Sequence, residues 1–269
     1  MQLDRYASRR YVGYIDPRFD CEDLRLLIEH ANEVEDFEGA ERVPTRPGRI
    51  VHRLSIASGR GPAEVYTHLL RNDRLVETIR PPQAFTVLRT GRRMLACGLP
   101  TARVLVAVRP TWMPLNRTSF VVTLAIPDAV PLSSLEETDF SGRIGGFKKL
   151  HLIRQIATQT AWMHAHGFFH KDLIAANILV ASRRSTPVIW FVGLGRAGSA
   201  RWMPPYWRQR RWASDLCALM QSEIAAISDR DRAVFLETYL RALGPARGSR
   251  LVRSFLLRMM SKAKDGREL

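Results

Sequence analysis

The sequence predicts an α+β chain of two lobes, a small β-rich lobe followed by a larger helical lobe. Apolar runs of strand length fall between residues 50 and 126, whereas the pattern after residue 147 repeats with the period of a helix. Pro127–Pro131 separates the two regions and is expected to connect them. The expected organisation is an N-terminal extension with one helix at 1–48, the small lobe at 49–126 and the large lobe at 127–269.

The first half of the chain has the signals of a small sheet with helices around it. Short apolar runs predict strands, a glycine-containing connection predicts a hairpin turn, and a proline pair followed by helical spacing predicts a helix. The expected elements are a helix opened by Asp20, a hairpin of strands 50–56 and 64–70 with its turn at 58–62, a helix at 83–97, and strands at 101–109 and 119–126.

The second half of the chain is predominantly helical. Leu150, Ile153, Ala157, Ala161 and Met163 recur at helical spacing and predict a long helix at 147–166. The remaining expected elements are strands at 177–180 and 188–192 and helices at 213–227, 229–243 and 250–262.

The composition bounds the class of protein and of partner. With 269 residues and 46% hydrophobic content, the chain can bury the core of one large domain or of two lobes. Its 41 basic and 26 acidic residues give a net charge of +15, and nearly all of the basic residues are arginine. This excess indicates anionic partners such as phosphorylated glycolipid, an acidic membrane surface or nucleic acid. Scattered arginines that serve only as surface charge are the alternative.

Cysteine spacing and hydropathy exclude several further classes. Cys21, Cys97 and Cys217 are far apart and odd in number, so the sequence indicates neither a disulfide framework nor a zinc site. The N-terminus has no apolar signal core, and no run approaches the ~18 apolar residues that span a bilayer. We expect a cytoplasmic protein, either soluble or peripherally attached to a membrane.

One local motif carries chemistry. His170-Lys171-Asp172-Leu173 is followed by Asn177, directly before an apolar run. This is the catalytic-loop pattern of kinase-fold phosphotransferases, in which the Asp orients the acceptor hydroxyl and takes its proton while the Asn holds a metal under the phosphates. The motif therefore predicts a bilobal protein-kinase-like fold. An ordinary helix-loop-strand with a buried His and a capping Asp is the alternative.

Four pieces of the chain together resemble the bacterial lipopolysaccharide (Kdo/heptose) kinase family. They are Thr118–Thr123 with Ile126-Pro127, Trp162–Leu173, Gly195-Arg196-Ala197, and Arg211 with Asp215-Leu216. The resemblance runs from about residue 50 to residue 239 and is strongest at 118–215. It implies a protein-kinase-like enzyme that phosphorylates sugars of the lipopolysaccharide core with ATP, at the cytoplasmic side of the inner membrane.

The same resemblance implies roles for particular residues. Asp172 would be the catalytic base and Asn177 a ligand of Mg²⁺ beside ATP. His170 and Asp215 would support the catalytic loop, Asp215 by accepting hydrogen bonds from its backbone. His68, Asn177 and Gly193 occupy positions that would contact the nucleotide.

Three positions depart from the family pattern. In such enzymes a strand lysine, a helix glutamate that holds it and a second metal-binding aspartate position the phosphates. Here His68 replaces the lysine, Val87 lies near the place of the glutamate, and Gly193 replaces the aspartate. No Asp or Glu occurs between Asn177 and Asp215, so no neighbouring acid can substitute for the missing one.

These departures favour a degenerate member of the family, a pseudokinase or a strongly impaired phosphotransferase linked to envelope glycolipid. An active lipopolysaccharide core sugar kinase with Asp172 as base is the alternative, because Asp172 and Asn177 are both present. Such an enzyme would use one metal ion or an unusual clamp such as an arginine. A third hypothesis is a peripheral membrane-binding or scaffold protein.

A cationic and aromatic segment supports the third hypothesis. Three tryptophans interleave with four arginines, namely Trp202, Trp207 and Trp212 with Arg201, Arg208, Arg210 and Arg211. We interpret the arginines as a candidate surface for phosphorylated glycolipid or an anionic membrane. The alternative is that the segment packs on the large lobe with a solvated arginine face. Nucleic acid is a weaker partner hypothesis because no helix concentrates the basic charge, and the sequence names no protein partner.

Overall fold

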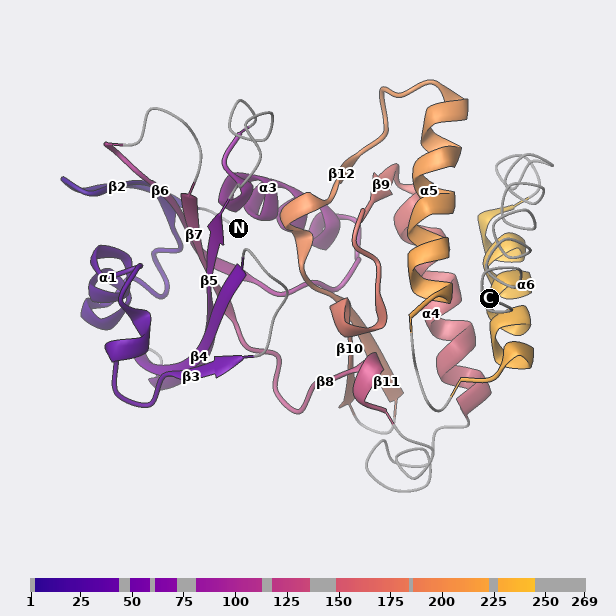
Figure 1. Ribbon diagram of the computed structural model, residues 1–269, viewed down its shortest axis with the longest axis horizontal. Helices are drawn as coiled ribbons and strands as arrows, with labels where there is room; N and C mark the ends of the chain where they lie inside the picture. Colours follow the sequence, from indigo (N-terminus) through magenta and orange to yellow (C-terminus); the bar gives the residue numbers. More distant parts are fainter. Residues whose placement is uncertain are drawn as a thin grey trace, which may run out of the picture. The chain divides into compact units, whose positions relative to one another are not determined.

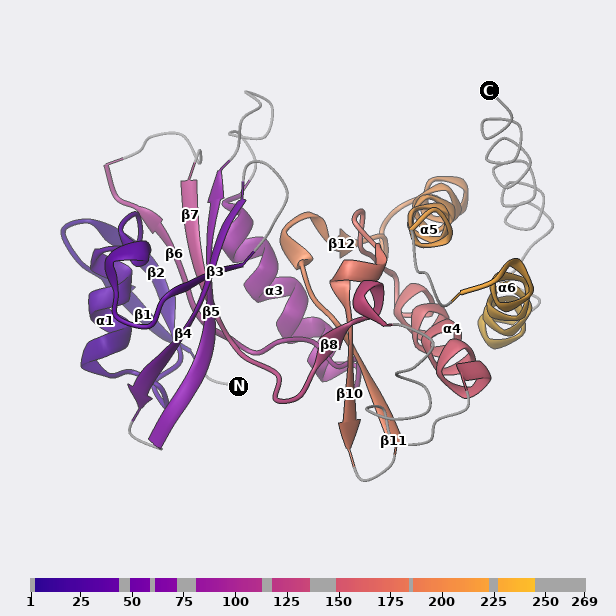
Figure 2. The ribbon, with the colours of Figure 1, turned by 60° about the horizontal axis from the view of Figure 1, so that its bottom comes forward.

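The computed structural model describes residues 3–43, 49–58, 61–71, 81–112, 118–135, 149–183, 186–222 and 227–244. The chain divides into two compact units, which Figures 1 and 2 show. One unit, the small lobe, takes in Met1–Arg93 and Ala102–Ile126. The other unit, the large lobe, takes in Met94–Thr101 and Pro127–Leu269.

The small lobe is built on a seven-stranded antiparallel sheet. Its strands are β1 Asp4–Ala7, β2 Tyr11–Ile15, β3 Glu41–Val43, β4 Arg49–Ser58, β5 Gly61–Arg71, β6 Val104–Pro110 and β7 Thr118–Leu124. They follow the order β1-β2-β6-β7-β5-β4-β3. The hairpin of β4 and β5 pairs Arg49 with Leu70 at one end and Ser58 with Gly61 at the other, which confirms the predicted hairpin. The strands expected at 101–109 and 119–126 are confirmed as β6 and β7.

Three strands of this sheet lie in the first 48 residues, where the sequence predicted only a helix. β2 pairs with β6, and Gly13 permits this approach because a Cβ there would lie 2.1 Å from the backbone oxygen of Ala107. β1 and β3 form the two edges of the sheet, and most of their residues are exposed. Exposed edge strands need no alternating apolar pattern, so the sequence did not reveal them.

Helices lie on both faces of the small-lobe sheet (Figures 1 and 2). On one face, α1 (Glu22–Glu29) buries Leu24, Leu27 and Ile28 in a cluster with side chains from β4, β5, β6 and β7. On the other face, α3 (Gln83–Ala96) packs Ala84 and Leu88 into a second apolar cluster. Both helices were predicted from their apolar spacing, and both are confirmed.

The large lobe combines three described helices with two small sheets. The helices are α4 Lys149–Ala165, α5 Pro205–Met220 and α6 Asp229–Leu243. One sheet has the order β11 (Thr186–Phe191), β10 (Ile178–Arg183) and β8 (Val130–Pro131), and the other pairs β12 (Gly198–Ser199) with β9 (Phe168–Phe169). α4 packs against α6 and buries Leu152, Ile156 and Met163. Within the described residues, none of the helices has the length and apolar content of a membrane-spanning segment.

Some predicted elements of the large lobe are displaced. α5 begins at Pro205 rather than at Ala213, because the arginines of its first two turns obscure the apolar periodicity. Leu150 was predicted to face the core but is 38% exposed, since the buried side of α4 passes through Leu152 at this turn. The predicted connector 127–131 contributes β8 to a sheet. The helix expected at 250–262 lies outside the described residues.

Candidate functional site

The predicted catalytic loop runs from β9 to β10 in the large lobe. Before it, Gly167 turns the chain out of α4 with a φ of +79°, a left-handed conformation that L side chains rarely adopt. After it, a short 3-10 helix at Ala175–Asn177 leads into β10. The predicted residues His170, Asp172 and Asn177 therefore lie together in the loop that joins β9 to β10.

A buried carboxylate on α5 holds the backbone of this loop. Asp215 is 1% exposed, and its two oxygens accept hydrogen bonds from the N–H groups of His170 and Lys171, each at 2.6 Å. Lys171 has a φ of +63°, a conformation that costs free energy for a residue with a Cβ. The charge-assisted hydrogen bonds offset that cost and fix the loop backbone. Asp215 thus lies where it can brace the loop.

Asp215 lies beside a group of buried aromatic side chains that the sequence did not mark as part of the site. His164 is fully buried, with Nε2 3.4 Å from Oδ2 of Asp215 and Nδ1 2.7 Å from the hydroxyl of Tyr239 on α6. Its ring also stacks on Trp212, with 5.5 Å between the centroids. Burial raises the pKa of Tyr239, and the negative charge of Asp215 raises it further, so the hydroxyl stays protonated. No local sequence signal could join His164 to Tyr239, because 75 positions separate them.

His170 ties the loop to the segment that precedes Gly193. Its buried ring lies with Nε2 2.8 Å from the backbone oxygen of Val192. The N–H of Val192 donates in turn to the backbone oxygen of Asn177 at 3.0 Å. These two contacts place Gly193 directly beside the catalytic loop.

The side chain of Asn177 fills the space beside Gly193. Its Nδ2 donates to the backbone oxygen of Asp172 at 2.7 Å. A Cβ built on Gly193 would lie 2.6 Å from Oδ1 of Asn177 and 2.9 Å from its Cγ, distances at which atoms overlap. Gly193 also has a φ of +74°. Both the backbone conformation and the packing at residue 193 therefore suit glycine.

The residues present do not fit the Mg²⁺–ATP complex that the resemblance implies. Mg²⁺ requires several oxygen ligands in near-ideal octahedral geometry, and carboxylates are its usual protein ligands. Asp172 and Asn177 offer one carboxylate and one amide oxygen, whereas Gly193 offers no side chain.

His68 and Val87, the small-lobe residues that stand where the family pattern has a lysine and a glutamate, carry no charge. Burial lowers the pKa of His68 to about 4, and the positive charge of Arg49 acts in the same direction, so the imidazole is neutral at pH 7. Its Nε2 lies 3.3 Å from the hydroxyl of Thr123 on β7. Val87 packs against the apolar cluster between α3 and the sheet. His68 and Val87 therefore form neither the cation nor the ion pair that steadies phosphates in such enzymes.

The four arginines of the predicted anionic-substrate surface divide into two pairs. Arg208 lies over the ring of the buried Trp212, with its Cζ 6.0 Å from the centroid, and Arg211 lies over Phe169 at 5.9 Å. Arg201 and Arg210 instead lie over the exposed rings of Trp202 and Trp207. The packing interpretation therefore holds for Trp212, while Trp202 and Trp207 are on the surface.

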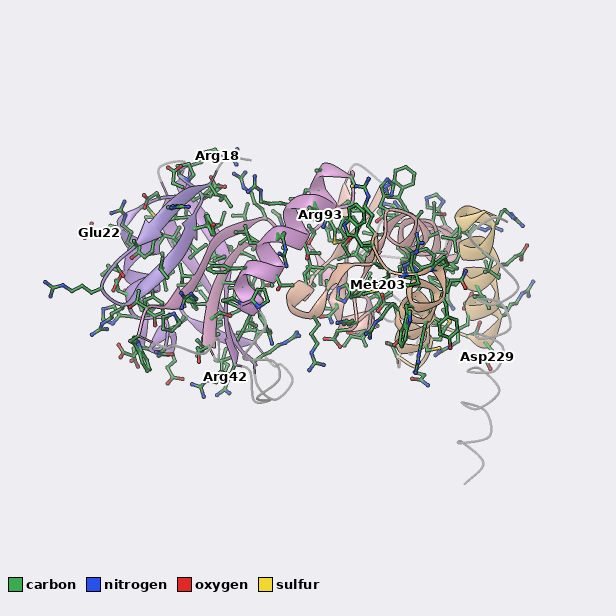
Figure 3. The ribbon with its side chains drawn as sticks, turned by 90° about the horizontal axis from the view of Figure 1, so that it is seen from above. Arg18, Glu22, Arg42, Arg93, Met203 and Asp229 are labelled. Atoms are coloured by element: carbon green, nitrogen blue, oxygen red, sulfur yellow. The ribbon has the colours of Figure 1, made fainter. Side chains whose placement is uncertain are left out.

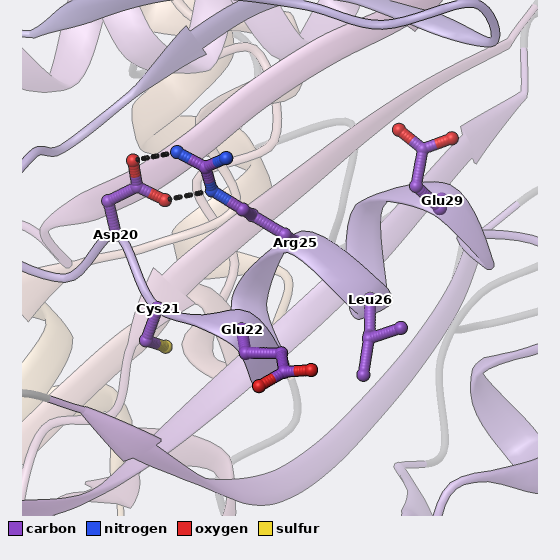
Figure 4. A pocket seen from close by; sticks show the side chains of 6 residues that line it. All are labelled: Asp20, Cys21, Glu22, Arg25, Leu26 and Glu29. Atoms are coloured by element: carbon purple, nitrogen blue, oxygen red, sulfur yellow. Dashed lines mark hydrogen bonds and ion pairs between the residues drawn. The ribbon is translucent and has the colours of Figure 1, made fainter.

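A separate hollow of about 430 Å³ lies over α1 in the small lobe. Figure 4 shows its lining side chains, which are Asp20, Cys21, Glu22, Arg25, Leu26 and Glu29. Asp20 was predicted to open the helix, but both of its oxygens are paired with the guanidinium of Arg25 at 2.7 Å, and Cys21 takes the N-cap position. None of the predicted site residues lines this hollow.

The fold and the loop together define a kinase-like protein of two lobes. The family model described as "Lipopolysaccharide kinase (Kdo/WaaP) family" matches residues 63–239, which is more than half of the chain. The chain belongs to this family, as the resemblance in its sequence predicted.

The solved structures contain a similar fold, and the curated proteins contain no match. A structure titled "WaaP in complex with acyl carrier protein" is similar to this chain with a TM-score of 0.61 and 23% sequence identity. The similarity covers 92% of this chain and 97% of that chain. It supports the α+β, bilobal kinase-like fold.

Proposed function

We propose that this chain is a member of the lipopolysaccharide kinase family whose phosphoryl-transfer site is strongly impaired, and that it serves as a binding or scaffold protein linked to envelope glycolipid. The observation that carries the proposal is the contact between Asn177 and Gly193. The place of a metal-binding carboxylate is taken by the amide of Asn177, and Gly193 adopts a conformation that suits glycine.

Electrostatics supports the proposal. Phosphoryl transfer depends on positioning and on neutralising the charge of the transferring group, and a single cationic contact to that group can be worth ~10³-fold or more in rate. In this chain the strand position carries a neutral His68, the helix position carries Val87, and the metal position carries Gly193. The loss of all three charges would leave Mg²⁺–ATP weakly held and poorly aligned.

An active sugar kinase with Asp172 as base is the second candidate, and the loop geometry favours it. Asp215 holds the backbone of His170 and Lys171 at 2.6 Å, and Asn177 holds the backbone of Asp172 at 2.7 Å. An active enzyme would need cations from elsewhere, for example from arginine side chains.

Nucleotide binding and transfer distinguish the two candidates. We expect no Mg²⁺-dependent thermal shift with millimolar ATP, and no phosphate transfer from labelled ATP to lipopolysaccharide core oligosaccharide above the level of Asp172→Ala. The assay should be run with and without acyl carrier protein, because the similar WaaP structure was determined with that protein. Mg²⁺-dependent turnover that Asp172→Ala abolishes would show that the enzyme candidate is correct.

A matched variant controls for folding. Asp229 is an exposed aspartate on α6, with a side chain 96% exposed, so Asp229→Ala should leave any activity unchanged. If Asp172→Ala and Asp229→Ala lower activity equally, the residual signal does not come from the catalytic loop.

A further inference from the structure

Large aromatic side chains are exposed where the chain enters α5. Trp202 is 91% exposed, Tyr206 is 56% exposed and Trp207 is 51% exposed. Single exposed apolar residues are ordinary, but three exposed aromatic rings within six positions are a candidate patch. Tyr206 and Trp207 touch edge to face, with 6.0 Å between their centroids, so the rings are neighbours in space as well as in sequence.

The same patch is positively charged. The guanidinium of Arg201 lies 6.0 Å from the ring centroid of Trp202, and that of Arg210 lies 5.9 Å from Trp207. Residues 193–214 include five arginines and no Asp or Glu. The first turn of α5 has no acidic residue, whereas α6 has Asp229 and Asp231 at its start. The partial positive charge of the α5 N-terminus therefore adds to that of the arginines.

We propose that this surface, made of Arg201, Trp202, Tyr206, Trp207 and Arg210, binds the headgroup region of a bilayer that contains anionic phospholipid. Trp and Tyr favour the membrane–water interface because each has an apolar body and a polar edge. Arginines beside them are attracted to anionic headgroups, at about 1 kcal/mol per residue near the surface. Ring and guanidinium also contact one another, so both can enter the interface together.

The shape of the surface favours a bilayer over nucleic acid. Single-stranded nucleic acid binds along charged grooves whose aromatic residues stack on successive bases. Here the rings belong to a turn and to the first turn of α5, at one end of the large lobe, and Met203 marks the turn in Figure 3. Exposed rings at the end of a lobe can contact the flat surface of a bilayer. Membrane attachment needs only the fold, so it is independent of whether the chain transfers phosphate.

Vesicle flotation with the full chain tests the proposal. Wild-type protein should float with vesicles of phosphatidylcholine and phosphatidylglycerol, and binding should fall in high salt, which screens exposed charges. Replacing both arginines, Arg201→Gln/Arg210→Gln, should lower binding roughly 30-fold. The matched control Arg154→Gln/Arg230→Gln removes the same charge from exposed positions on α4 and α6 and should bind at least tenfold better than the surface variant.

The aromatic contribution needs its own variants. Trp202→Ala/Trp207→Ala should lower binding to the same vesicles roughly tenfold or more, because apolar contact with the interface is lost. Trp112→Ala changes a 67% exposed tryptophan of the small lobe and should bind as wild type does. If the double variant folds poorly, Trp202→Ala alone remains informative, since that ring is 91% exposed.

Three outcomes would overturn the proposal. The first is that wild-type protein fails to float with anionic vesicles. The second is that the surface variants bind as well as their controls. The third is that single-stranded RNA, and not the vesicles, binds the wild type and loses affinity in Trp202→Ala/Trp207→Ala. None of these outcomes depends on ATP, so failure here is distinguishable from failure of the impaired-kinase proposal.

Discussion

The amide oxygen of Asn177 lies 2.6 Å from the point where a Cβ on residue 193 would be. In kinases the two corresponding positions cooperate in holding metal ions. In this chain residue 193 has no side chain, and the amide of Asn177 occupies the space that a side chain there would need. The contact can be measured separately from the backbone conformation, because the chain offers a second glycine with the same φ.

Gly193→Ala should lower the free energy of unfolding by roughly 1–3 kcal/mol, because it combines a left-handed alanine with displacement of Asn177. Gly98 has the same φ of +74°, and a Cβ there would meet nothing within 4 Å. Gly98→Ala should therefore show only the backbone cost. Urea denaturation measures both, and equal costs for the two variants would contradict the packing at Gly193.

Asp215→Ala should be among the most destabilising single substitutions in the large lobe. It leaves the N–H groups of His170 and Lys171 without the carboxylate, and each such loss costs about 1–3 kcal/mol. Asp229→Ala, at an exposed position, should change stability by less than about 0.5 kcal/mol. Chemical denaturation of the two variants gives the comparison. A small effect of Asp215→Ala would mean that other contacts hold the loop.

Tyr239→Phe should destabilise the protein by about 1–2 kcal/mol, because it removes the hydroxyl that lies 2.7 Å from the buried Nδ1 of His164. Tyr206→Phe removes a hydroxyl from an exposed ring and should have almost no effect on stability. Thermal unfolding of both variants checks the prediction. An equal fall in the melting temperatures of the two variants would contradict the prediction.

His68 should make stability depend on pH in mildly acidic solution. Its folded-state pKa of about 4 lies below the ordinary value of 6.5, so the unfolded chain binds more protons between these values. Stability should therefore fall as the pH is lowered from 6.5 to 4, and this contribution should level off below pH 4. His68→Gln should remove the contribution, so the stability of this variant should fall less steeply than that of the wild type between pH 6.5 and pH 4. Parallel curves across this window would contradict the lowered pKa of His68.

Local patterns were predictable from the sequence, and long-range contacts were not. The loop from His170 to Asn177 was predictable because its spacing is local and a strand follows it directly. The β4–β5 hairpin was predictable from two apolar runs and a glycine turn. The contact of His164 with Tyr239 was not predictable, because it depends on how α4 packs against α6.

Charge and exposure explain the remaining differences between the elements predicted from the sequence and those in the structure. β1 and β3 are exposed edges without an apolar pattern, and the arginines at the start of α5 interrupt its periodicity. The absence of a carboxylate at residue 193 was visible in the sequence. The occupation of that space by Asn177 was not, because it depends on the left-handed backbone of Gly193 and the hydrogen bond from Asn177 to Asp172.

The hydrogen bond from Asn177 to the backbone of Asp172 gives this asparagine a structural role. Together with Asp215, it would maintain the loop conformation in a protein that never bound ATP. Selection for a stable fold alone could therefore preserve Asn177 and Asp215 long after a chemical activity had disappeared. The hydrogen bonds of Asn177 and Asp215 to the loop backbone account for both residues without reference to ATP, whereas the residue at position 193 bears directly on metal binding.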